Sequence, residues 1–340
     1  MAVQNIHITY NREGYIMCTA ISFNTKDHYF GRNMDYEHSY DESITITPRN
    51  YSFKYKMMPE SNNHLAMIGM AYVVCDYPLY YDATNEKGLS MAGLNFPGNA
   101  IYYSAVEGKD NIAPFEFIPW ILGQCATISE VENLLSRLNL VDISYNSELP
   151  LSPLHWLISD KEKSIVVETM ESGMKVYHNP IGVLTNNPPF DYHLWNLCNY
   201  MHLSKTPPTN QFSTNLELSA YSRGMGAIGL PGDLSSASRF VKAAFVKANS
   251  VCKHSEKESV SQFFHILGSV EQQRGCVLVG DNQYEKTIYS SCCNTDKGIY
   301  YYKTYDNSLI TAVDMHKTNL AGEQLIKYPL LLEPTIRWQN

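Results

Sequence analysis

The sequence has no uninterrupted apolar segment long enough to cross a membrane. Its longest uncharged apolar run, Leu65 to Cys75, falls well short of the roughly 20 residues that a membrane-spanning helix needs. The 340 residues are 44% hydrophobic and 18% charged, a balance that excludes intrinsic disorder. This length gives one large domain or about two of ~150 residues. We therefore expect a soluble globular protein with no membrane partner.

Basic clusters and metal-binding cysteine patterns are also missing. Lysine and arginine number 26 against 34 aspartates and glutamates, a net charge of −8, so a nucleic-acid partner is not expected. The eight cysteines form no CxxC pair or other metal-ligand spacing, and no HExxH motif occurs. We predict neither a metal nor an organic cofactor. Scattered cysteines in a long chain are typical of the reducing cytoplasm.

The N-terminus lacks the basic start and apolar stretch of a secretory signal. Codons for Arg12-Glu13-Gly14 can read as a bacterial ribosome-binding site just upstream of Met17. We therefore expect residues 1–17 to be a leader, either a start assigned too early or a removed segment. Loss of Met17 would leave Cys18 with a free α-amino group. The alternative is that the leader forms an ordinary strand or a short pro-segment.

From Cys18 onward no linker, charge block or repeat marks a boundary, so we predict one domain over residues 18–340. A capping box at Thr127 and Glu130 predicts a helix that runs to about Leu138. Further helices are expected after Pro188 and Pro189, from Asp233 or Ser235 through Val246, and over 257–267. Alternating patterns predict strands at 18–23, 28–35, 43–47, 65–74, 88–94, 155–159, 164–168, 174–177, 182–185, 287–291, 298–305 and 308–313. Strands at both ends with helices between them indicate an α+β fold of two sheets covered by helices.

Familiar catalytic patterns are scarce. No Ser-His-Asp or Cys-His pairing stands out, and His155, His193, His202 and His265 lie in apolar periodic stretches typical of core or boundary histidines. The letters Gly224-x-Gly226-x-x-Gly229 match a dinucleotide motif. No strand leads into them, and Pro231-Gly232 interrupts the helix that would have to follow. We interpret this stretch as a tight loop before the next helix, able to direct Arg239 toward a site.

An N-terminal cysteine needs no histidine, because its own α-amine can accept the thiol proton. That amine titrates near ~7.7 to 8.0 in model peptides. A guanidinium beside the sulfur would stabilise the thiolate, and a carboxylate would orient the ammonium. If the strands at 18–23 and 28–35 pair as a hairpin, Arg32 and Asp35 return beside Cys18. The alternative is a strand end with a surface ion pair.

Five ordered motifs, spread from Met17 to the last third of the chain, resemble the choloylglycine hydrolase family. They are Met17-Cys18-Thr19-Ala20 with Phe30-Gly31-Arg32-Asn33-Met34-Asp35-Tyr36, Asn85-Glu86-Lys87-Gly88-Leu89, Gly93-Leu94-Asn95-Phe96-Pro97-Gly98, Leu184-Thr185-Asn186-Asn187-Pro188, and residues 229–240 from Gly229-Leu230-Pro231-Gly232 to Arg239-Phe240. The family comprises bile salt hydrolases and penicillin V acylases. The resemblance implies the four-layer αββα sandwich of N-terminal nucleophile hydrolases, with two antiparallel sheets between helix layers.

The resemblance also implies roles for individual residues. Cys18 corresponds to the nucleophile, Arg32 lies beside the thiol, and Asp35 holds the α-amine. Asn95 and Asn186 match positions of the oxyanion site, and Arg239 matches the arginine that supports the cluster. Taken without the resemblance, either asparagine could equally be a turn residue. An amide-blocked Cys18 has no basic amine, so activity requires a start at Met17 or removal of the leader.

With asparagine at position 95, this motif resembles that of bile salt hydrolases. The resemblance of penicillin V acylases to one another includes a tyrosine at the same position. We therefore expect an amidohydrolase that cleaves conjugated bile salts, such as glycocholate and taurocholate, through a thioester. The resemblance implies a homotetramer. Two alternatives stay open: a penicillin V acylase or other N-acyl amidase, and a non-catalytic binding protein whose Cys18 remains blocked.

Overall fold

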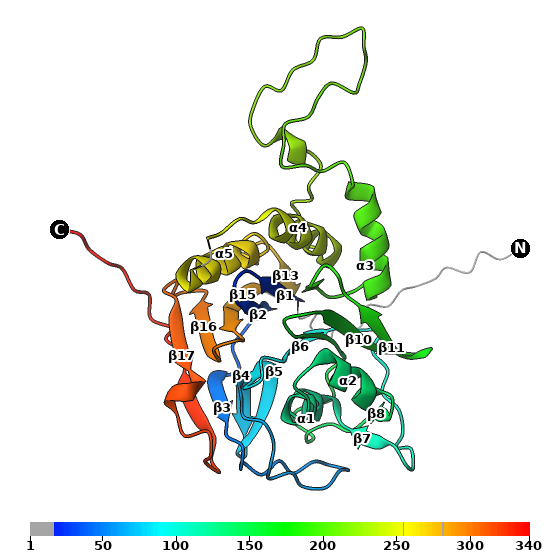
Figure 1. Cartoon of the computed structure of the whole chain (residues 1–340), viewed down its shortest axis with the longest axis vertical. Coiled ribbons are helices and arrows are strands. Elements are labelled where there is room, and N and C mark those ends of the chain that lie inside the picture. Colours follow the sequence, from blue (N-terminus) through cyan, green and yellow to red (C-terminus); the bar gives the residue numbers. More distant parts are fainter. Residues whose placement is uncertain (1–16, 254, 281) are drawn as a thin grey trace, which may run out of the picture.

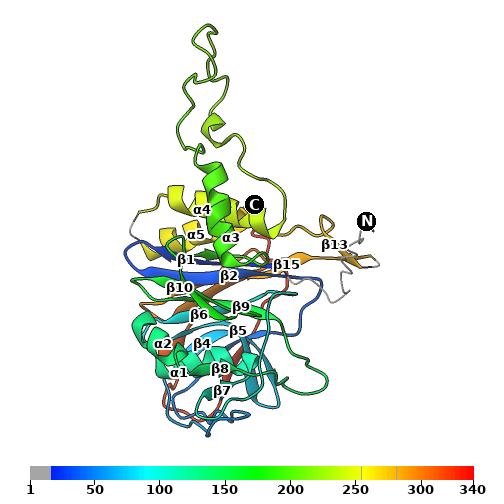
Figure 2. The same ribbon diagram turned by 90° about the vertical axis from the view of Figure 1, so that its right-hand side faces the viewer.

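Two antiparallel sheets stacked face to face form the body of the protein. The computed structural model describes residues 17–253, 255–280 and 282–340. Helices α4 (Ser236–Asn249) and α5 (Glu256–Gly268) cover the outer face of one sheet, and α1 (Phe117–Gln124) and α2 (Ile128–Leu135) cover the outer face of the other (Figures 1 and 2). The predicted αββα order of layers is therefore confirmed.

Each of the two large sheets is antiparallel throughout its described strands. In neighbour order, the first sheet contains β12 (Val183–Leu184), β1 (Met17–Asn24), β2 (His28–Tyr36), β15 (Lys286–Asn294), β16 (Ile299–Thr304) and β17 (Thr311–Asp314). The second contains β11 (Gly173–His178), β10 (Ser164–Met170), β9 (Leu154–Ser159), β6 (Ser90–Asn95), β5 (Tyr77–Asn85), β4 (Met67–Val74), β3 (Ser43–Thr47) and β18 (Ile326–Pro329). The first and last described strands thus belong to different sheets.

Short elements complete the described chain. Strands β13 (Leu278–Gly280) and β14 (Gln283–Tyr284) form an antiparallel pair, and β7 (Asp110–Ile112) and β8 (Leu138–Leu140) form a parallel one. Helix α3 (Phe190–Leu197) continues into the 3-10 turn η2 (Cys198–Tyr200); the other 3-10 turns are η1 (Pro114–Glu116), η3 (Met225–Ala227) and η4 (Met315–Lys317). Residues 201–230, here named the arm, project from the body beyond α3 in both views (Figures 1 and 2). None of the described helices is long and apolar enough to span a bilayer.

The predicted hairpin is present and fixes the geometry around Cys18. Strands β1 and β2 pair in a register that sets Cys18 opposite Met34 and Ala20 opposite Arg32. Side chains directly opposite each other, and those two residues further along, share one face of a sheet. Cys18 and Arg32 therefore lie on the same face of the hairpin as diagonal neighbours. Asp35, one residue beyond Met34, belongs to the opposite face.

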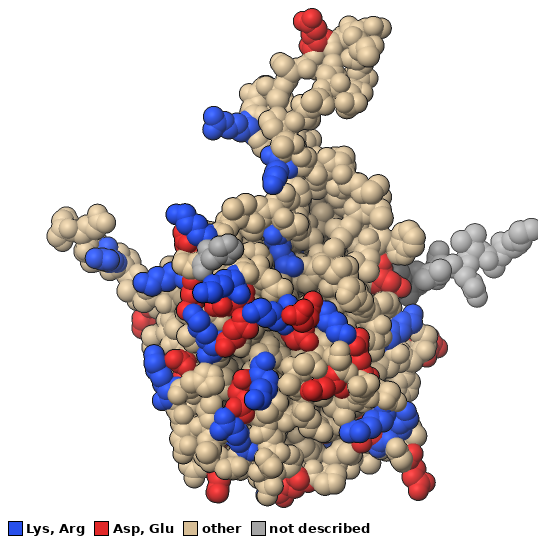
Figure 3. Space-filling view, viewed as in Figure 1, with Lys and Arg blue, Asp and Glu red and all other residues tan. Residues whose placement is uncertain are grey.

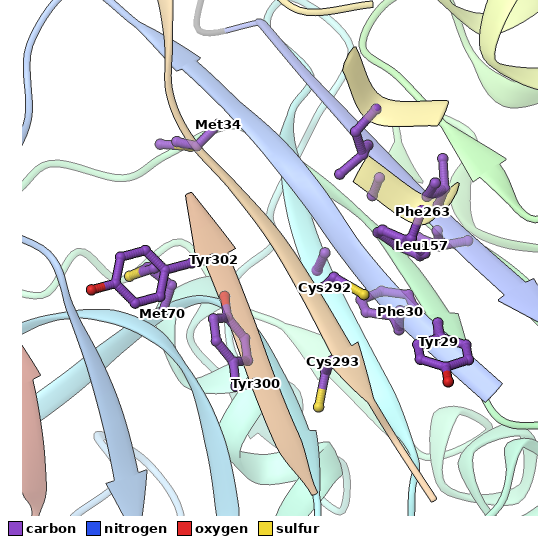
Figure 4. Packing of buried hydrophobic residues seen from close by; sticks show 14 of the residues in the cluster. Tyr29, Phe30, Met34, Met70, Leu157, Phe263, Cys292, Cys293, Tyr300 and Tyr302 are labelled. Carbon is purple, nitrogen blue, oxygen red and sulfur yellow. The ribbon is translucent and has the colours of Figure 1, made fainter. Parts of the chain in front are cut away.

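Two hydrophobic clusters hold the layers together. The first joins β1, β2, β15 and β16 to the second sheet and to α4 and α5. In Figure 4 Phe30 from β2 lies close to Cys292 of β15, and the sulfurs of Cys292 and Cys293 point to different sides of their strand. The second cluster packs the other sheet against α1 and α2. Burial of apolar area on this scale is the main favourable term in folding.

The structure differs from the sequence expectations at several elements. The helix predicted to reach about Leu138 ends at Leu135, and Leu138 begins β8. Helix α1 was not predicted, because seven of its eight residues are buried and no polar face marks its period. Strand β5 was also missed, since Pro78 and Asp82 interrupt its apolar pattern.

Candidate active site

Cys18 lies in the interior with only 1% of its surface exposed. Its sulfur accepts a hydrogen bond from Nη2 of Arg32 and lies 3.9 Å from the sulfur of Met34. Burial raises the pKa of the Cys18 thiol, and the Arg32 guanidinium is the largest influence in the opposite direction. The hydrogen bond from the Asp35 backbone N–H and the charge of Arg239 act in the same direction as Arg32.

Arg32 is held by main-chain oxygens of the opposite sheet. Its Nη1 donates to the carbonyl oxygen of Tyr81 on β5, 3.0 Å away, and to that of Gly93 on β6. Burial alone would lower the pKa of Arg32, but nearby groups, first among them Cys18, raise it instead. The guanidinium is therefore a fixed positive charge that connects the two sheets and donates a hydrogen bond to the Cys18 sulfur.

Asp35 and Glu285 place two buried carboxyl groups near the start of β1. Oδ1 of Asp35 accepts from Oγ1 of Thr287 at 2.6 Å, while no donor in residues 17–253, 255–280 and 282–340 reaches Oδ2. Oε1 of Glu285 accepts from the Met17 backbone N–H at 2.7 Å. Burial raises the pKa of Asp35 to about 6 and that of Glu285 to about 8.

Asn186 and Arg239 bring the remaining polar groups to Cys18. Oδ1 of Asn186 accepts from the Cys18 backbone N–H at 2.7 Å and from Nη2 of Arg239 at 2.8 Å. Nδ2 of Asn186 donates to the carbonyl oxygen of Asn95 at 2.8 Å. Nη1 of Arg239 donates to the carbonyl oxygen of Cys18 and to Oγ1 of Thr19, each at 2.6 Å. Burial lowers the pKa of Arg239, but Asp35 and Glu285 oppose this effect.

The structure therefore brings all six predicted site residues together. Cys18, Arg32, Asp35, Asn186 and Arg239 are connected through hydrogen bonds or close charges, and Asn95 joins them through its main-chain oxygen. A thiol, a guanidinium, amide groups and the nitrogen of the same cysteine within one small volume are the groups that acyl transfer requires. The alternative of a surface ion pair is wrong, because Arg32 and Asp35 are 1% and 0% exposed.

Nothing in the described part of the chain groups three or more histidine, cysteine, aspartate or glutamate side chains as a metal site would. Two cavities of about 400 Å³ each lie in other regions. One is lined by Ile181, Leu197, Val241 and their neighbours, the other by Ser22, Asn24, Asp160 and theirs. None of the six site residues lines either cavity.

The histidines divide into two groups. His155 and His193 are fully buried and hydrogen-bonded, as expected of core histidines. His202 and His265 are exposed, so the expectation of a core or boundary position is wrong for them.

Comparison with known proteins identifies the family of the chain. The family model described as linear amide C–N hydrolases, choloylglycine hydrolase family, matches residues 18–328. The chain belongs to the choloylglycine hydrolase family. Over 317 residues it is 57% identical to a bile salt hydrolase/transferase of Lactiplantibacillus plantarum, covering 93% of this chain and 98% of that protein. A bile salt hydrolase/transferase of Clostridium perfringens is 41% identical, with 92% and 96% covered.

Solved structures confirm the fold of this choloylglycine hydrolase. A cysteine-to-alanine variant of conjugated bile acid hydrolase from Clostridium perfringens superposes with a TM-score of 0.88 at 40% identity, covering 95% of this chain and all of that one. Penicillin V acylase from Agrobacterium tumefaciens gives a TM-score of 0.70 at 18% identity, covering 92% and 90%. The second match concerns the fold alone, which is that of N-terminal nucleophile hydrolases.

Sequence reasoning missed two residues that contact this site. Ser236, at the start of α4, accepts at Oγ from the Asn186 backbone N–H at 2.9 Å. Glu285 immediately precedes β15, far from Cys18 in sequence, and no local pattern sets it apart from a surface glutamate. Only the pairing of β15 with β2, which places Lys286 opposite Tyr36, brings it to the start of β1.

We predict that Arg32→Met slows alkylation of Cys18 by iodoacetamide. The guanidinium stabilises the thiolate, so its loss raises the thiol pKa, and each pKa unit lowers the thiolate fraction near neutral pH about tenfold. Mass spectrometry of the peptide containing Cys18, followed over time at pH 7 to 9, measures the rate. Arg32→Lys should be intermediate. Arg274→Met, which removes an exposed arginine paired with Asp306, is the control, and equal rates in Arg32→Met and this control would contradict the assignment.

Proposed function

We propose that this choloylglycine hydrolase cleaves the amide bond of glycine- or taurine-conjugated bile salts. The observation that carries the proposal is the setting of Cys18, whose thiol accepts a hydrogen bond from the Arg32 guanidinium and whose backbone N–H donates to the Asn186 side chain. The names of the relatives support the substrate class, since proteins up to 57% identical to this chain are called bile salt hydrolase/transferase. The motif around Asn95 also resembles that of bile salt hydrolases more than that of penicillin V acylases.

The proposed reaction needs only groups of this site. The Cys18 α-amine accepts the thiol proton, and the thiolate attacks the acyl carbon of the amide. Asn186 and Asn95 stabilise the oxyanion, and the protonated amine then donates its proton to the leaving nitrogen. Water attacks the resulting thioester and releases the bile acid. An amine with a pKa near the working pH can act first as base and then as acid.

We predict that Cys18→Ser abolishes turnover of glycocholate and taurocholate, with a loss of at least about 10³-fold because a serine hydroxyl stays protonated. Released glycine or taurine is measured by chromatography, and circular dichroism checks the fold. The control is Cys198→Ser, which changes an exposed thiol and should keep wild-type activity. Normal turnover by Cys18→Ser would reject the nucleophile. If the wild type hydrolysed penicillin V but neither bile salt, the proposed substrate class would be wrong and the alternative of a penicillin V acylase would be supported.

The active enzyme begins at Cys18 in this proposal. A peptide nitrogen cannot accept a proton, and in the described chain the Cys18 nitrogen is an amide that donates to Asn186. Close to it lies Asp35, a fully buried carboxylate whose Oδ2 has no donor in the described residues. An ammonium group on Cys18 would supply a positive charge to this carboxylate. The match to the family model also begins at residue 18.

Intact-mass measurement of the active protein should therefore show that residues 1–17 are absent. A version expressed from Met17 should lose the methionine, since cysteine is small, and hydrolyse glycocholate. A matched version acetylated at Cys18 should lose about 10² to 10⁴ in turnover, the usual contribution of a general base. Full activity of protein that retains residues 1–17 would contradict both the mechanism and the assignment of residues 1–17 as a leader absent from the enzyme. It would not by itself support the alternative of a non-catalytic binding protein.

A cytoplasmic homotetramer is the proposed form of the enzyme. The eight cysteines are free thiols, the state that a reducing cytoplasm maintains. The arm exposes large apolar side chains on a segment that leaves the body, and few charged groups appear on it (Figure 3). The exposed apolar side chains of the arm are Met201, Phe212, Leu216, Leu218, Tyr221 and Ile228, with Phe212 82% and Tyr221 85% exposed. Apolar surface of this kind typically marks a protein–protein contact, which supports assembly of the chain with copies of itself.

We predict that Phe212→Asp combined with Tyr221→Asp shifts the protein from tetramer to smaller species. Charged groups in an apolar interface lose hydration without gaining partners, so association should weaken. Light scattering behind size-exclusion chromatography gives the molar mass. Ile336→Asp, a change at another exposed apolar residue far along the chain, should leave the mass unchanged. A tetramer that persists in the double variant would exclude the arm as the contact.

A further inference from the structure

Two buried histidines hold the backbone on either side of the Asn186 side chain. His155 Nε2 lies 2.8 Å from the carbonyl oxygen of Thr185, and His193 Nε2 lies 3.0 Å from the carbonyl oxygen of Asn186. The Asn186 backbone N–H donates to Oγ of Ser236. Two consecutive carbonyl groups and the N–H between them are thus fixed by three side chains. Neither histidine contacts the thiol, so neither is needed as a proton carrier.

The protonation of His193 follows from its contacts. A carbonyl oxygen only accepts, so Nε2 must carry the proton. Burial lowers the pKa of His193 to about 4, so the ring is neutral near pH 7. Its Nδ1 atom has no hydrogen-bond donor in the described residues. His193 is therefore a neutral donor, and it uses its one N–H group on the carbonyl oxygen of Asn186.

His155 is part of a longer chain of contacts. Its Nε2 also faces a carbonyl oxygen, so it donates there, and Nδ1 lies 2.9 Å from Oε1 of Glu168. The same oxygen accepts from the Phe190 backbone N–H at 3.0 Å. Glu168 thus ties the ring to the first residue of α3, four residues after Asn186.

Ring stacking connects each histidine to another site residue. The His155 ring is stacked on Phe96, with centroids 4.3 Å apart and planes within 5°. Phe96 directly follows Asn95. The His193 ring is stacked on Phe240, 4.6 Å away at 18°, and Phe240 directly follows Arg239. Each histidine therefore contacts the backbone at Asn186 on one side and, on the other, an aromatic ring that directly follows a site residue. That site residue is Asn95 for His155 and Arg239 for His193.

We propose that His155 and His193 are positioning residues that set the distance of the Asn186 amide from the Cys18 thiol. This inference rests on the proposed function, in which Asn186 stabilises the oxyanion. A displacement of about 1 Å can cost about 10²-fold in rate, so loss of either donor should lower kcat and leave substrate affinity nearly unchanged. Because both residues act through Asn186, their effects should vanish when Asn186 has no amide.

The test is a double-mutant cycle on the mature enzyme with glycocholate. His193→Phe and His155→Phe keep a ring for stacking but remove the donor. Each should lower kcat about tenfold to a hundredfold with KM within about twofold. In combination with Asn186→Ala, neither should lower kcat further. His193→Gln and His155→Gln retain an N–H near the Nε2 position and should recover kcat to within about threefold of the wild type.

The control is His64→Phe, which removes another buried histidine bonded to the carbonyl oxygens of Leu65 and Tyr51. It should lower Tm without changing kcat. Independent, multiplicative losses of kcat in the Asn186→Ala background would overturn the proposal. So would a loss in the Gln variants as large as in the Phe variants, which also decides the matter if a Phe variant does not fold. A wild type that turns over only penicillin V would refute the proposed substrate, and the same cycle run on that amide would still test the positioning role.

Discussion

The contact between the Arg32 guanidinium and the Cys18 sulfur is the interaction on which the site depends. A thiol removed from water resists ionisation, because a thiolate in an apolar interior has lost its hydration. A permanent positive charge within contact distance stabilises the thiolate and so lowers the thiol pKa. That charge must itself be fixed, and two main-chain oxygens, those of Tyr81 and Gly93, hold the guanidinium.

These contacts explain why the site requires the complete sandwich. Cys18 and Arg32 share the face of the hairpin that is turned to the second sheet, where β5 and β6 supply the carbonyl groups. Arg239 reaches the Cys18 carbonyl from helix α4, which lies on the opposite face. Both sheets and the helix layer of α4 therefore contribute contacts around Cys18. Regular elements of this kind hold the thiol in a more precise position than a loop would.

Some of this arrangement could be predicted from sequence because it is local. The alternation of residues 18–23 and 28–35 was enough to infer the hairpin, and a pairing near its open end places Arg32 diagonally across from Cys18. Ser235 was recognised as one of two candidate caps, and it is the residue that caps α4. The roles expected of Asn186 and Arg239 came only from family resemblance, and their contact with each other was not predicted. Glu285 and the roles of His155 and His193 escaped prediction, since they follow from pairing between distant segments.

The buried charges also bear on where the working chain begins. With Met17 attached, burial raises the pKa of both Asp35 and Glu285, and the charge of Asp35 raises the pKa of Glu285 further. Arg32 is already engaged by the thiol and two carbonyl groups, and Arg239 by Asn186, Thr19 and the Cys18 carbonyl. An ammonium group at Cys18 would add one positive charge where two carboxyl groups meet. It would lower both pKa values and keep Asp35 ionised at neutral pH, so the same charge that prepares the nucleophile would stabilise the acids that surround it.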